Sequence, residues 1–165
     1  MNDTNRAVVG TLSLVGLVVG ILTGGILGYK AWRIQQDIYG WMYLAQISNE
    51  PHDMYTYLSN VKSGMEAWGM TSGNSALFFP DPSTDMGKLY RAIGQDIDQS
   101  RYLESFDKGS PQYAINLDNL RGAIREQTIP AYQYFANHDG LVVSIFCWIG
   151  WIVFLILGLI WLLTV

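Results

Sequence analysis

The sequence has little cysteine and little charge, and both shortages restrict its function. Its 165 residues include one cysteine, Cys147, so no disulfide joins two parts of one chain. Only 15% of the residues are charged and the net charge is −4, which leaves no basic surface for nucleic acid. The sequence also lacks a CxxC pair, a zinc-ligand spacing, a P-loop and a dinucleotide-binding GxGxxG turn. We therefore expect a chain that is not an enzyme and has no cofactor or small-molecule substrate.

Two segments contain no charged residue, and they account for the hydrophobic composition. Residues 7–29 and 140–165 are each long enough, at 1.5 Å per helical residue, to cross the roughly 30 Å hydrocarbon layer of a bilayer. The first is longer than the apolar part of a secretion signal and has only Arg6 before it, which argues against cleavage. We predict a tail at 1–6, a transmembrane helix at 7–29, and a joint with a second transmembrane helix at 137–165.

The segment between them, 30–136, is polar and has the pattern of helices. Apolar residues recur there with helical period, and no long stretch alternates with the period of a strand. Three residue pairs are typical of helix starts, because each places a capping side chain before a proline; they are Glu50-Pro51, Asp81-Pro82 and Ser110-Pro111. We expect helices at 30–48, 51–69, 82–108 and 111–135, with Ile129-Pro130 interrupting the last.

These elements predict an all-α membrane protein. Two transmembrane helices, at the N- and C-terminal ends, are joined by an extramembrane four-helix up-down bundle, and the first bundle helix is continuous with the first transmembrane helix. An even number of bundle helices returns the chain to the membrane where the second span begins. This outline resembles periplasmic four-helix sensory receptors in topology only.

Four glycines recur at every fourth position of the first apolar segment and so lie along one face of a helix; they are Gly16, Gly20, Gly24 and Gly28. Glycine costs roughly 1 kcal/mol against alanine in a helix, whereas in lipid it allows two backbones to approach closely. We predict a helix-packing interface. Three occupants fit this interface. One is the protein's own second span, which contributes Gly150 and Gly158; the others are a helix of a partner protein and a flat cofactor.

Two further groups of apolar residues are candidates for contacts with a partner or with the membrane interface. Leu77, Phe78 and Phe79 lie in the connection between the second and third bundle helices, which the up-down path places near the bilayer. The simpler interpretation is that they plug the end of the bundle; the alternative is that they enter the interface or touch a neighbouring subunit. Trp148 and Trp151 lie deep in the second span, where large aromatic side chains face lipid or another subunit.

The histidines and the apolar spans argue against a metal site and against a transport pathway in this chain. His52 and His138 belong to opposite ends of the predicted bundle, so we expect no metal ligation by them. Neither span contains an ionisable residue, which proton relays, ion pathways and voltage sensors nearly always use. We therefore do not expect this chain alone to be a pump or an ion channel.

The function that fits these features is a non-catalytic accessory subunit of a larger integral membrane complex, such as an energy-transducing oxidoreductase, a monooxygenase or a transporter. Its partners are other integral membrane subunits and lipid. Two alternatives are a self-associating envelope or virus-coat protein and a ligand-sensing receptor whose output domain is a separate protein. We expect a two-pass protein of a plasma or cytoplasmic membrane, with the acidic bundle outside the cytoplasm.

Overall fold

The computed structural model describes residues 3–163, and these residues form helices with no strand among them. They divide into two compact units. One contains the chain up to Ala31 and from His138 onward, and the other contains Trp32–Asn137. Residues 1–2 of the predicted tail and 164–165 of the second predicted span lie outside the described residues.

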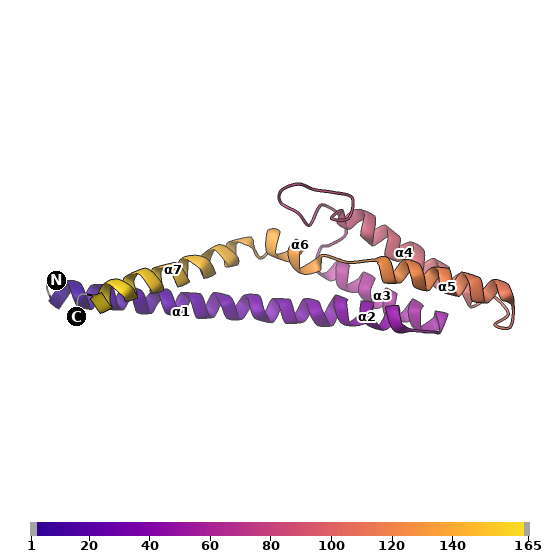
Figure 1. The fold of residues 1–165 in the computed structure, drawn as a ribbon, viewed down its shortest axis with the longest axis horizontal. Helices are drawn as coiled ribbons and strands as arrows, with labels where there is room; N and C mark the ends of the chain where they lie inside the picture. The colour runs from indigo at the N-terminus through magenta and orange to yellow at the C-terminus, as the bar shows by residue number, and fades with distance from the viewer. Residues whose placement is uncertain (1–2, 164–165) are drawn as a thin grey trace. The chain divides into compact units, whose positions relative to one another are not determined.

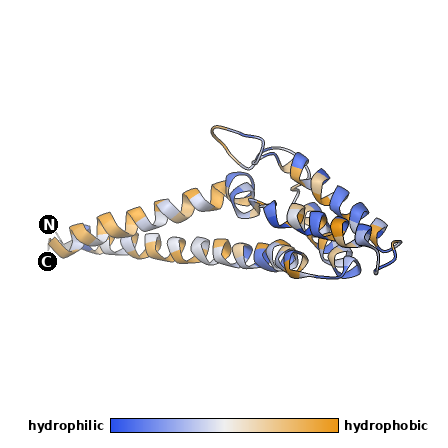
Figure 2. Cartoon of the chain, turned by 45° about the vertical axis from the view of Figure 1, so that its right-hand side comes forward, coloured by the Kyte–Doolittle hydropathy of each residue, from blue (hydrophilic) through white to orange (hydrophobic). Residues whose placement is uncertain are grey.

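The first unit consists of two long apolar helices, the α1–α7 pair. Helix α1 spans Asp3–Ile34 and α7 spans Leu141–Leu163. Hydrophobic residues cover most of α7 and of the first part of α1 (Figure 2). Both helices are long and apolar enough to span a bilayer, which suggests a two-pass membrane protein.

The helix that begins in α1 continues far beyond residue 29, as the sequence predicts. It is helical from Thr4 to Ile47 and includes a π-helical turn at Gln35–Tyr39, followed by α2 at Gly40–Ile47. The backbone N–H of Gly40 donates to the carbonyl oxygen of Gln35, five residues earlier, which defines the π turn. No pattern in the sequence predicts this turn.

Helix α3 spans Pro51–Ala67 and begins where the sequence predicts. Pro51 occupies the first turn, where its missing N–H costs nothing. The side chain of Glu50 makes no capping hydrogen bond; Ser48 instead accepts a hydrogen bond from the Glu50 backbone N–H at 3.2 Å. The apolar stripe faces the core, and its members Met54, Leu58, Val61 and Met65 are fully buried.

Helix α4 spans Met86–Leu103, so the predicted start at Asp81-Pro82 is wrong. Asp85 is the residue that caps this helix, because its carboxylate accepts from the backbone N–H of Lys88 at 2.9 Å. Asp81 closes a turn before the helix by accepting from the backbone N–H of Ser83 at 2.7 Å. Both aspartates fit the capping pattern. The hydrogen bond from Ser75 N–H to Thr84 O, across the loop before the helix, selects the second.

The predicted last helix is divided in two, as Pro130 requires. Helix α5 spans Pro111–Glu126 and is capped by Ser110, which accepts from the Tyr113 backbone N–H. Residues 127–130 are not helical, and α6 spans Ala131–Asn137. The proline lacks an N–H and restricts the residue before it, so the helix ends and restarts.

The core of the 32–137 unit lies among α2, α3, α4 and α5. Helix α2 packs against α3 and α5, and α4 packs against the same two helices; Figure 1 shows α3, α4 and α5 as neighbours. Two arginines of α5 bind the C-terminal end of α2, where carbonyl groups lack helical partners: Arg121 donates to Ser48 O and Arg125 to Gln46 O. The predicted up-down direction of these helices stays a prediction.

Candidate functional site

The closest approach in the α1–α7 pair is between glycines. A Cβ atom added to Gly150 would lie 2.7 Å from the backbone nitrogen of Gly20 and 2.9 Å from the carbonyl oxygen of Gly16. A Cβ atom added to Gly16 would lie 2.9 Å from the nitrogen of Phe154. Real Cβ atoms do not approach other atoms so closely, so each of these positions requires glycine.

The other glycines of the predicted interface have looser surroundings. A Cβ on Gly24 would lie 3.7 Å from the sulfur of Cys147, and one on Gly158 would lie 3.3 Å from the hydroxyl of Ser13. A Cβ on Gly28 would have no neighbour within 4 Å, and the same holds for Gly25. Helix α7 therefore lies on the Gly16–Gly24 part of the glycine face and leaves Gly25 and Gly28 uncovered.

Two polar side chains also join the α1–α7 pair. Ser13 is buried and donates to the carbonyl oxygen of Phe154 at 3.2 Å, and the thiol of Cys147 lies 3.7 Å from Gly20 O. Such hydrogen bonds hold helices together in lipid, where no water competes for them. Ser13 was not among the residues singled out from the sequence, although it extends the row of small residues three positions before Gly16.

The two tryptophans of α7 that the sequence analysis names, Trp148 and Trp151, have different surroundings. The indole of Trp151 covers Gly20, since a Cβ there would lie 3.3 Å from the ring, and its ring meets Phe154 edge to face with centroids 6.0 Å apart. Trp148 is 71% exposed. Trp151 thus contributes to packing within the pair, whereas most of Trp148 is accessible to lipid or to another protein.

An apolar groove of about 600 Å³ opens along the α1–α7 pair, next to Ser13. It is lined by Gly10, Ser13, Leu14, Phe154, Leu155, Gly158, Leu159, Trp161 and Leu162. Lipid tails are as apolar as these side chains and are sufficient to cover them in a bilayer. We therefore assign no ligand to this groove.

The loop between α3 and α4 exposes its apolar residues, so the prediction that they plug the bundle is wrong. Phe78 is 78% exposed and Phe79 is 93% exposed, with Leu77 about half exposed. The core positions at this end of the helices are filled by Met70 and Met86, both fully buried. Since methionine adapts to irregular gaps, the core closes without the two phenylalanines.

The π turn contacts α3 through Gly64, and no pattern in the sequence indicates this contact. A Cβ on Gly64 would overlap the carbonyl oxygen of Asp37 and lie 3.0 Å from its carbonyl carbon. The carboxylate of Asp37 accepts from the indole N–H of Trp68 at 3.1 Å and lies 3.4 Å from the guanidinium of Arg33. These contacts fix α3 against the π turn.

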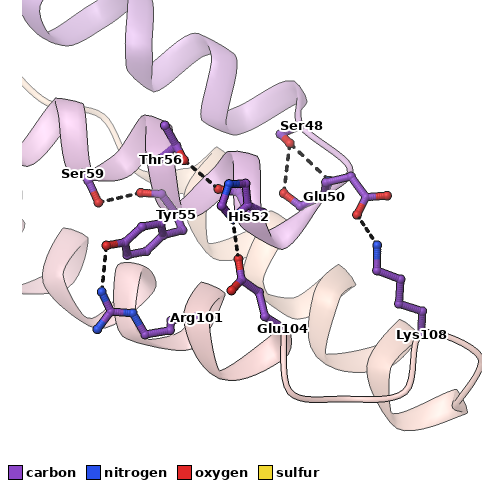
Figure 3. Close-up of polar contacts among 9 residues, drawn as sticks. All are labelled: Ser48, Glu50, His52, Tyr55, Thr56, Ser59, Arg101, Glu104 and Lys108. Atoms are coloured by element: carbon purple, nitrogen blue, oxygen red, sulfur yellow. Dashed lines mark hydrogen bonds and ion pairs between the residues drawn. The ribbon is translucent and has the colours of Figure 1, made fainter.

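Exposed polar pairs connect α3 with the end of α4 and the turn that follows it (Figure 3). His52 Nδ1 lies 3.0 Å from Glu104, Lys108 donates to Glu50 at 2.8 Å, and Arg101 donates to the Tyr55 hydroxyl at 2.7 Å. The Glu50 carboxylate raises the pKa of Lys108. Exposed pairs of this kind stabilise a protein little.

Among residues 3–163 no three His, Cys, Asp or Glu side chains gather into a metal-binding group.

A buried polar pair joins α4 to the segment after α5. Asp96 is 6% exposed and accepts from the Gln127 side-chain amide at 2.5 Å. The carbonyl oxygen of that amide is buried without a hydrogen-bond partner. Gln127 also lines an open pocket of about 390 Å³. Burial raises the pKa of Asp96 above the 3.8 of a free aspartate, and the Gln127 hydrogen bond partly opposes this change.

Replacing Asp96 by asparagine is expected to stabilise the protein at pH 7 by about 1 kcal/mol, the net worth of one hydrogen bond. Asparagine carries no charge to bury, and its NH₂ group is able to donate to the unpaired oxygen of Gln127. Because the folded pKa of Asp96 is raised, its contribution to stability is present below the unfolded pKa and is lost as pH rises through the folded pKa. The advantage of the variant should therefore grow from pH 3.5 to pH 7.

Urea unfolding of the detergent-solubilised chain at several pH values measures this effect. The matched control is Asp98→Asn, an exposed position on the same helix, where we expect a change within about 0.5 kcal/mol at every pH. An Asp96→Asn variant less stable than the natural protein at pH 7 would contradict the interpretation.

No known family, curated protein or solved structure matches this chain. The function is therefore argued from the residues and contacts above.

Proposed function

We propose that this chain is a non-catalytic accessory subunit of a larger integral membrane complex and that it binds its partner through the uncovered part of the α1 glycine face. The observation that supports this is the absence of any described atom within 4 Å of a Cβ added to Gly25 or Gly28. Each helical glycine costs roughly 1 kcal/mol. At Gly16 and Gly20 packing against α7 offsets that cost, whereas no residue among 3–163 offsets it at Gly25 and Gly28.

A partner helix is the occupant that best fits this surface. Gly25 and Gly28 are three residues apart and so lie on neighbouring positions of one helix face. In lipid, helices associate through close backbone packing, for which such small residues are suited. The exposed Trp148 of α7 adds a large aromatic contact surface.

The proposal also includes the placement of the chain in the membrane that the sequence predicts. Helices α1 and α7 cross a plasma or cytoplasmic membrane, and the 32–137 unit forms an up-down bundle outside the cytoplasm. There it covers part of the partner's outer surface. The partner belongs to an oxidoreductase, a monooxygenase or a transporter.

Substituting both Gly25 and Gly28 with leucine is expected to release the partner. Overpacking a helix contact costs about 1–3 kcal/mol, which corresponds to about a 5- to 150-fold loss of affinity. The matched control is Val15→Leu with Val18→Leu, because these two exposed residues have the same spacing on α1 and lie off the glycine face. The control should keep the partner.

The measurement is extraction from the native membrane in mild detergent, a native gel, and identification by mass of each polypeptide in the band. Other chains in fixed ratio, lost only in the glycine double variant, would support the accessory function. A band containing only copies of this chain would overturn it in favour of a self-associating protein. Retention of the partner by the double variant would show that the Gly25–Gly28 surface is not the contact.

A further inference from the structure

We propose that the tip of the α3–α4 loop, Leu77-Phe78-Phe79, inserts into the interfacial layer of the membrane that the chain itself spans. These three consecutive apolar side chains are exposed, and Phe79 is almost completely so. A water-soluble surface rarely presents adjacent aromatic residues in this way unless they contact a partner or a membrane. The inference does not depend on the accessory function, because lipid alone is the partner.

The loop holds its tip on a closed base. Ser75 N–H donates to Thr84 O at 2.8 Å and Met86 N–H donates to Gly73 O at 3.0 Å, so the two sides of the loop are joined at its base. Figures 1 and 2 show the loop extending away from α4. Because its base is fixed by these hydrogen bonds, the tip is presented in a defined direction.

The tip has an unusual backbone. Phe79 has a φ angle of +58°, in the left-handed region that aromatic residues rarely adopt, and among residues 3–163 it is the one residue other than glycine with a positive φ. Beyond it, the Asp81 carboxylate accepts from the Ser83 hydroxyl and from Ser83 N–H; these hydrogen bonds lower the pKa of Asp81 and close the next turn. The chain thus bends at Phe79 with both phenylalanine rings exposed, although a glycine would adopt the same φ without strain.

The segment that leads into the loop is hydrogen-bonded to α6, the helix that precedes the second span. Asn137 donates from its side-chain amide to Ser75 O at 2.7 Å, and Tyr134 donates from its hydroxyl to Gly69 O at 3.1 Å. Helix α7 begins at Leu141, four residues after Asn137, so the connecting chain spans at most about 14 Å. Phe78 is three positions after Ser75, a reach of at most about 10 Å. The apolar layer that α7 enters is therefore within reach of the tip.

The composition of the loop favours uncharged insertion into the interface over attraction to anionic lipid. Residues 70–85 contain no lysine or arginine and two aspartates, Asp81 and Asp85. Attraction to anionic headgroups requires basic residues, whereas aromatic side chains settle at the membrane–water interface without them. We therefore expect insertion into zwitterionic lipid, with little dependence on salt.

A fluorescent label at the tip tests this in vesicles that contain only this chain. In the background Cys147→Ser, which removes the one native thiol, Phe78→Cys is labelled with an environment-sensitive dye and the full chain is reconstituted in phosphatidylcholine. The matched control is Ser105→Cys, an exposed position beyond the end of α4. Lipids with a nitroxide near the headgroup should quench the dye at position 78 and leave position 105 bright. The emission at 78 should also be shifted to the blue.

Two results would overturn the proposal. One is a dye at position 78 that is as bright and as red-shifted as at 105 in a chain with unchanged helix content. The other is a blue shift at 78 without quenching by nitroxide lipid, because the tip then contacts protein. A second label, at Leu77→Cys, repeats the test if replacing Phe78 alters folding. Loss of a partner subunit cannot produce these results, since none is present in the vesicles.

Discussion

Replacing Gly64 by alanine is expected to destabilise the 32–137 unit by about 1–3 kcal/mol, the usual cost of overpacking a core. In an ordinary helix the same substitution gains roughly 1 kcal/mol. Here the added carbon would overlap the carbonyl group of Asp37, which is backbone and is held in the π turn. Separating α3 from that turn would also lengthen the 3.1 Å hydrogen bond between Trp68 and Asp37.

Gly122→Ala is the matched control, because a Cβ there has no neighbour within 4 Å and the residue lies inside α5. This variant should be more stable than the natural protein by roughly 1 kcal/mol. Urea unfolding in detergent, followed by circular dichroism, compares the two. If both variants gain stability, the backbone contact between α3 and the π turn is not needed for the fold.

Replacing Gly150 by leucine is expected to separate α7 from α1. The new side chain would begin 2.7 Å from Gly20 N and 2.9 Å from Gly16 O, both backbone atoms. An overpacking cost of about 1–3 kcal/mol should lower the equilibrium constant for helix pairing about 5- to 150-fold. Because the contact is glycine against glycine, no rotation of a neighbouring side chain relieves the overlap.

The native thiol gives a direct readout of this pairing. A Cβ on Gly24 would lie 3.7 Å from Cys147 Sγ, so Gly24→Cys places two thiols within reach of a disulfide after a small adjustment. Mild oxidation should link residues 24 and 147 within one chain, as peptide mass identifies. Adding Gly150→Leu should lower the yield about tenfold, whereas Ile149→Leu, at an exposed neighbour, should not. Equal yields in the two variants would contradict the contact.

Much of the helical structure follows from local signals in the sequence. The apolar runs, the proline at 51 and the Ser110-Pro111 pair mark helix starts that the structure contains, and Pro130 marks the interruption. These signals are local, because they depend on the chemistry of adjacent residues. Asp81 and Asp85 show the limit of such signals. Both residues suit a helix start, and the pairing of Ser75 with Thr84 across the loop decides between them.

The parts that could not be predicted depend on contacts between distant segments. Nothing near Gly64 in the sequence indicates that it meets Asp37, and the π turn has no characteristic composition. The glycine row indicates a packing face, but not where α7 leaves it between Gly24 and Gly28. The exposure of Phe78 could not be predicted either, because large hydrophobic side chains usually lie in the core. Only the structure shows that Met70 and Met86 already fill the core at this end of the helices.

The order of the segments along the chain also implies an order of assembly during synthesis. All residues of the 32–137 unit precede α7 along the chain, and most of its helices pack against their sequence neighbours, which favours rapid folding. The contact of Ser13 with Phe154 joins residues 141 positions apart, so it forms after α7 has left the ribosome. Until then α1 stands in the bilayer with its whole glycine row uncovered. If α1 binds a partner helix as proposed, a partner that arrives in that interval meets Gly16 and Gly20 as well, and α7 then competes with it for those positions.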